Sequence, residues 1–255
     1  MLEETKIFRR ATLASIITST YPMIVVGSYF GITPWNMNRL SIDESDLSVS
    51  ILIFGIFFVL SNQIAGRILV PKYGTRLVMS LAFPLITFSS LLSITSSSYL
   101  YFLLTFIPAG IGWGASGPIG GIHCQLIEKH FNKIITPYYA MGFNIGILVG
   151  GGLAGIIMRY NFEPDIIFLV LSFFSILVAY LVLHLGLPSN LDFKGKGEKF
   201  KIPESNILIF GFLLFFVFGS GGIVMDWSTL WLSKDLNTPL YLASMGLIFF
   251  SIGGI

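Results

Sequence analysis

The sequence predicts an all-α protein whose helices cross a membrane several times. Of its 255 residues, 54% are hydrophobic and only 11% are charged, whereas soluble domains average roughly half and about a quarter. Apolar stretches of bilayer-crossing length recur along the chain, and such lengths exclude β-barrel strands, which need only about ten residues of alternating polarity. The expected fold class is therefore a polytopic α-helical integral membrane protein.

Eight apolar stretches are expected to form transmembrane helices. A bilayer core of about 30 Å needs roughly 20 helical residues. The stretches are residues 11–33, 46–66, 77–96, 99–126, 137–158, 165–187, 205–225 and 240–255. The first follows three basic residues, but its length and the seven stretches behind it predict an uncleaved helix instead of a secretory leader.

The polar residues between these stretches predict a division of the chain. We expect a six-helix bundle over residues 1–187, a polar linker over 188–204, and the start of a second bundle over 205–255. The last stretch reaches only about 24 Å at a helical rise, which predicts that the sequence is the first part of a longer protein. The alternative is an eight-helix protein with a short, tilted last helix.

The basic residues predict the orientation in the membrane. With the N-terminus in the cytoplasm, twelve of the 15 basic residues lie in cytoplasmic segments, and only Arg39, Arg159 and Lys234 lie outside. Cytoplasmic loops of membrane proteins carry such an excess of Lys and Arg. A multi-pass protein of the cell membrane with a cytoplasmic N-terminus follows.

Composition and motifs argue against several other functions. The net charge of +2 is too small and too dispersed for a nucleic-acid surface. Cys124 is the single cysteine, and His123 with His130 is too small a set for a metal site, so neither a metal nor a cofactor is expected. The nucleophile-elbow, His-Glu-x-x-His and phosphate-loop motifs of common enzyme classes are missing.

The loop between the second and third stretches carries a family resemblance. Gly66, Lys72, Gly74 and Arg76 lie in a segment that resembles the signature loop of the major facilitator superfamily of secondary transporters, although Pro71 stands where that family has an Asp. The glycine permits a tight turn, and the two basic residues suit helix-end carbonyls and anionic lipid. The resemblance implies a helical bundle of the superfamily type, truncated after about eight helices, and a gating role for this loop.

The seventh stretch extends the resemblance. Residues 219–228, a glycine-rich run ending in Asp-Trp-Ser, are similar to a segment of fucose-permease-like sugar transporters. This resemblance implies secondary active or facilitative transport of a small polar solute, such as a sugar, by alternating access, with a proton or sodium as coupling ion. The alternative is a non-transporting remnant or an oligomerising membrane scaffold, and a homo-oligomer is expected if 255 residues are the whole chain.

Polar and aromatic residues at membrane depth are the candidates for a binding site, because such groups usually face a cavity or another helix. The substrate-binding candidates are Tyr29, Trp113, Asn144, Asp226 and Trp227, and His123 is the candidate for proton coupling. Each has a structural alternative: interfacial or packing aromatics, an interhelical hydrogen bond for the amide, a helix-end acid for the carboxylate, and a packing or gate residue for the histidine.

Glycines mark two further expectations. Gly142, Gly146 and Gly150 share one helix face at a spacing of four, which predicts close contact with a neighbouring helix. Glycines also interrupt the first, fourth and seventh stretches, where bends around a cavity are expected.

Overall fold

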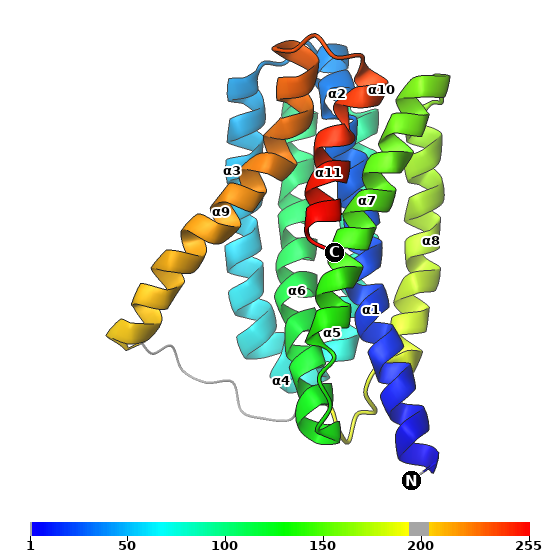
Figure 1. Ribbon diagram of the computed structural model, residues 1–255, viewed down its shortest axis with the longest axis vertical. Coiled ribbons are helices and arrows are strands. Elements are labelled where there is room, and N and C mark those ends of the chain that lie inside the picture. The colour runs from blue at the N-terminus through cyan, green and yellow to red at the C-terminus, as the bar shows by residue number, and fades with distance from the viewer. Residues whose placement is uncertain (1, 194–203) are drawn as a thin grey trace.

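The computed structural model describes residues 2–193 and 204–255, and the regular elements in these ranges are all helical (Figure 1). In chain order they are α1 (Leu2–Gly31), α2 (Thr33–Leu40), α3 (Glu44–Ile64), the π-helix η1 (Ala65–Leu69), α4 (Val70–Tyr73), α5 (Thr75–Thr95), α6 (Tyr99–Phe131), α7 (Thr136–Tyr160), α8 (Pro164–Leu185), α9 (Ser205–Lys234), α10 (Leu240–Ala243) and α11 (Met245–Gly253). The all-α prediction is confirmed.

Seven helices within the described residues are long and apolar enough to cross a membrane, and they coincide with the first seven predicted stretches. The eighth stretch is also apolar and helical, over Leu240–Gly253, but it is shorter than the other seven and a turn at Ser244 divides it into α10 and α11. Pro239 directly precedes α10, and the backbone at Ser244 departs from ideal helical geometry (ψ −7°). Of the expected linker over 188–204, residues 194–203 lie outside the described part of the chain.

The glycine face of α7 packs directly against α1, as predicted. A methyl group at Gly146 would collide with the Thr20 carbonyl oxygen and would approach Cβ of Met23 to 2.5 Å. At Gly150 it would collide with the carbonyl of Ile24. Only hydrogen at these positions lets the two helix backbones approach so closely.

The glycines of α6 serve the same purpose and do not interrupt the helix. Gly110 and Gly114 lie against the backbone of α3, and Gly112 lies against Ile86 of α5. Helices α6 and α9 run unbroken through their glycine-rich segments. The expected interruptions are therefore wrong for both, and close packing accounts for Gly110, Gly112 and Gly114 of α6, whereas Gly117 and Gly121 have open space around them.

Helix α9 meets the rest of the bundle through its C-terminal half. In Figure 1 its N-terminal half leans away from the other helices, and residues 204–217 are exposed. At the opposite end, Lys234 donates to a carboxylate oxygen of Glu44 at 2.5 Å, which joins α9 to the start of α3. The six helices α1, α3 and α5 to α8 form the close-packed body to which this end is attached.

Candidate functional site

A cluster of apolar side chains lies where α1, α7 and α11 meet. Its buried members are Met23, Ile147 and Leu247, and we call these three residues the central cluster. Trp113 of α6 and Met225 of α9 pack against it while remaining partly exposed. Five helices that are far apart in the sequence therefore contribute side chains to one region.

Two of the predicted binding residues carry polar groups and directly follow residues that pack against the central cluster, Phe143 and Met225. Asp226 follows Met225 directly, is partly buried, and accepts no hydrogen bond from the residues that the structure describes. On α7, the Asn144 amide donates to the Gly254 carbonyl at the end of α11 (2.8 Å) and to the Ala140 carbonyl (3.2 Å). The side-chain oxygen of Asn144 remains available to accept a hydrogen bond. The Asp226 carboxylate can accept hydrogen bonds or bind a cation.

The other two binding candidates lie in different surroundings. The hydroxyl of Tyr29 is within 2.6 Å of the Ser93 hydroxyl on α5, and its ring meets Phe106 and Phe168 edge to face. Trp227 packs against a separate cluster that includes Met37 of α2. Of the five binding candidates, the structure packs Trp113 against the central cluster and places Tyr29 and Trp227 elsewhere, while Asn144 and Asp226 each directly follow a residue, Phe143 or Met225, that packs against it.

The candidate proton carrier His123 is enclosed inside the six-helix body. Its side chain is fully buried, its Nδ1 lies 2.7 Å from the Thr75 hydroxyl, and its Nε2 accepts from the backbone N–H of Leu187 at 3.4 Å. Because Nε2 is an acceptor, the ring is neutral and Nδ1 carries the proton that is donated to Thr75. These fixed partners favour the packing or gate alternative for His123.

The same Thr75 hydroxyl donates onward to Asp192, a residue that no sequence pattern singles out. Asp192 Oδ1 accepts from the hydroxyl (2.7 Å) and from the backbone N–H (3.0 Å) of Thr75. Asp192 therefore caps the N-terminus of α5 across 117 residues of chain. We call Thr75, His123 and Asp192 the latch.

The predicted gating loop runs directly into this latch. Gly74 has a left-handed backbone (φ +82°), and a methyl group there would lie 2.5 Å from Asp192 Oδ2. Gly66 lies in η1 with open space around it, and Lys72 stacks over the Tyr73 ring at 4.9 Å. Arg76 lies in the first turn of α5, beside the latch.

At the other end of α5, Arg39 binds the last carbonyl groups. Its guanidinium donates to the Ser96 carbonyl (2.5 Å) and to the Asn36 side-chain oxygen (2.7 Å). Partial burial lowers the pKa of Arg39, yet the group stays protonated because a guanidinium is the most basic side-chain group in proteins. Sequence reasoning missed this role, because it treats Arg39 only as one of the three basic residues in the non-cytoplasmic segments.

Fold and site together define an α-helical membrane protein with polar groups at a junction of several helices. The family model described as Major Facilitator Superfamily matches residues 7–255. The chain belongs to the Major Facilitator Superfamily, which confirms the resemblance at the level of the superfamily.

Two known proteins illustrate the similarity. An uncharacterized MFS-type transporter of Yersinia pestis is 23% identical over 226 residues, which cover 87% of this chain and 57% of that protein. The structure of a bacterial homologue of the human drug peptide transporters PepT1 and PepT2 matches with a TM-score of 0.60 and 15% identity, over 96% of this chain and 49% of that chain. The chain thus spans about half the length of both.

Proposed function

We propose that the chain takes part in transmembrane transport of a small polar solute by alternating access. Membership of the superfamily supports membrane transport in general. The observation that carries the proposal is the central cluster, where α1, α7 and α11 meet and against which Trp113 of α6 and Met225 of α9 pack, with Asp226 next to Met225 in the chain. Transporters of this kind bind their substrate where helices of the two repeats face each other near mid-membrane.

The side chains at this junction suit a solute with both polar and apolar faces. Binding sites for small molecules combine aromatic walls with a few polar groups. Trp113 offers an aromatic face, Asn144 an amide oxygen, and Asp226 a carboxylate. A sugar is our first candidate, supported by the resemblance of residues 219–228 to sugar-transporter segments. In this proposal, Asp226 binds a solute hydroxyl or the coupling ion.

The positions of the basic residues support an orientation for this activity. We place the N-terminus, the gating loop and the latch on the cytoplasmic side, because twelve of the 15 basic residues lie in segments of that side. The gating loop then closes the inward face, and the latch fixes its end to the segment that follows α8. We also place residues 1–187 and 205–255 in different halves of the transporter.

Uptake into proteoliposomes that contain the purified protein tests the proposal. The panel comprises labelled sugars, other small polar solutes, and dipeptides, because the structural relative is a homologue of peptide transporters. We expect saturable uptake of one solute class, reduced at least about tenfold by Asp226→Asn, which removes a charged hydrogen-bond acceptor. Asp165→Asn is the control, because Asp165 is an exposed acid in the first turn of α8.

Absence of uptake for every solute, with protein that unfolds cooperatively and is correctly inserted, would contradict the proposal. A stable oligomer under those conditions would favour the scaffold alternative. The mass of the detergent-solubilised protein measures the oligomeric state. Equal losses in Asp226→Asn and Asp165→Asn would remove Asp226 from the binding site.

A further inference from the structure

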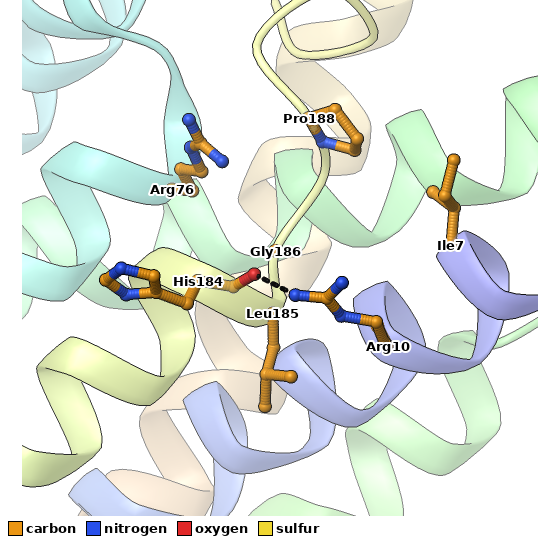
Figure 2. A pocket seen from close by; sticks show the side chains of 7 residues that line it. All are labelled: Ile7, Arg10, Arg76, His184, Leu185, Gly186 and Pro188. Atoms are coloured by element: carbon orange, nitrogen blue, oxygen red, sulfur yellow. Dashed lines mark hydrogen bonds between the residues drawn. The ribbon is translucent and has the colours of Figure 1, made fainter.

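A small pocket lies at the end of the bundle where α1 and α5 begin and α8 ends. Its volume is about 120 Å³. Its lining consists of Ile7, Arg10, Arg76, His184, Leu185, Gly186 and Pro188 (Figure 2). The pocket belongs to neither the central cluster nor the latch, although Arg76 links it to the latter.

Two arginines give the pocket its chemical character. Figure 2 shows Arg10 and Arg76 on either side of the chain segment from His184 to Pro188. Arg10 donates one hydrogen bond, to the His184 carbonyl at 2.7 Å, and that bond fixes the guanidinium at the pocket wall. A guanidinium has five N–H donors in a planar fork that matches phosphate oxygens. Most of these donors remain available for a ligand.

The charges around the pocket are predominantly positive. Lys6 and Arg9 line a neighbouring hollow of about 360 Å³ that shares Arg10 with the pocket. Asp192 is an acid beside Arg76, and its oxygens already accept from Thr75 and from the backbone N–H groups of Arg76 and Phe193. The potential in the pocket therefore favours an anion.

The remaining lining allows a ligand with an apolar part. Gly186 presents no side chain, and a methyl group there would lie 3.1 Å from Cβ of Arg76. The side chains of Ile7 and Leu185 add an apolar wall. The available volume is several times the roughly 30 Å³ that a water molecule occupies, so it can hold a phosphate group.

We propose that this pocket binds a phosphate group through Arg10 and Arg76, supplied by the headgroup of an anionic phospholipid. The position supports a lipid source, because all three helix ends lie at the boundary of predicted spans. Basic pockets between helices on the cytoplasmic side are sites for such headgroups. Only the choice of leaflet rests on the orientation that we propose above.

Titration of the purified full chain with phosphatidylglycerol, followed by native mass spectrometry, tests the pocket. We expect binding that Arg10→Gln and Arg76→Gln each weaken about fivefold, and that the double variant weakens about 25-fold. Arg10→Lys should give a smaller loss than Arg10→Gln, because it keeps the charge without the planar fork. Phosphatidylcholine, which carries no net charge, should bind without dependence on either arginine.

Lys129→Gln is the matched control, because Lys129 is an exposed basic residue in the last turn of α6 and does not line the pocket. Competition by millimolar inorganic phosphate, with the same dependence on both arginines, would identify soluble phosphate as the source. Insensitivity to phosphate would identify the lipid. Equal weakening by Lys129→Gln and Arg76→Gln, or none by either arginine variant, would overturn the site. The lipid titration uses no transported solute, so a failure of the proteoliposome uptake assay would not change its result.

Discussion

Asp192 and Arg39 bind opposite ends of the same helix. Asp192 accepts from the first N–H of α5 at Thr75 (3.0 Å), and Arg39 donates to the carbonyl of Ser96, which directly follows the last residue of α5 (2.5 Å). An acid at a helix N-terminus and a base at its C-terminus both complement the helix dipole. Each comes from a distant segment, so both ends of α5 are tied to the surrounding chain.

Asp192→Asn should lower the free energy of unfolding by about 1–2 kcal/mol, because it removes the charge from a buried cap. Unfolding of the purified protein in mixed micelles with a rising fraction of SDS measures the change. Glu163→Gln is the control: Glu163 occupies the N-cap position of α8, but its side chain makes no capping hydrogen bond. Equal effects in both variants would show that the cap contributes nothing specific.

Arg39→Lys should also destabilise the protein, by about 1 kcal/mol. Lysine keeps the positive charge but lacks the planar fork that reaches Asn36 and Ser96 together. The same unfolding assay applies, with Arg9→Lys as the control at an exposed position near the other end of the bundle. A loss of equal size at Arg9 would contradict the assigned role of Arg39.

Gly74→Ala should cost about 1–3 kcal/mol, whereas Gly66→Ala in the same loop should cost much less. Alanine at position 74 would be strained by the positive φ and would press against Asp192. At position 66 the added methyl group meets no atom within 4 Å. Unfolding in SDS micelles compares the two variants, and similar midpoints would argue against the tight approach of Gly74 to Asp192.

Gly146→Ala should destabilise the α1–α7 contact by about 1–3 kcal/mol, since overpacking moves two helix backbones apart. Gly152→Ala on the same helix is the matched control, because a methyl group there has open space within 4 Å. Alanine is the better helix former by about 1 kcal/mol, so Gly152→Ala should be neutral or stabilising. Thermal unfolding of both variants in detergent gives the comparison.

The sequence best predicts the features that depend on residues close to one another in the chain. Seven of the helices and the glycine face of α7 follow from stretch length and from a spacing of four residues. It was less informative for α2, whose eight residues are too short to show a clear period. Pro34 in its first turn and the left-handed Ser41 at its end set the limits of α2.

The roles of Asp192 and Arg39 could not be predicted, because each depends on a contact with residues more than 50 positions away. The same holds for the other two basic residues placed outside. Arg159 stacks over the Tyr241 ring at 4.6 Å, and Lys234 pairs with Glu44. The three exceptions to the charge rule therefore each have a specific partner, which a count of loop charges does not reveal.

Because α9 packs against the bundle through its C-terminal half, a rotation of the helix moves its exposed N-terminal end the most. Its 30 residues span about 45 Å at a helical rise, and the Lys234–Glu44 pair lies near the fixed end. Only the exposed residues 204–217, about 20 Å at a helical rise, extend beyond the packed half, so a rotation of about 10° there would move the N-terminal end of α9 by roughly 4 Å. A small rotation of the packed half is thus largest in its effect at the exposed end of this helix.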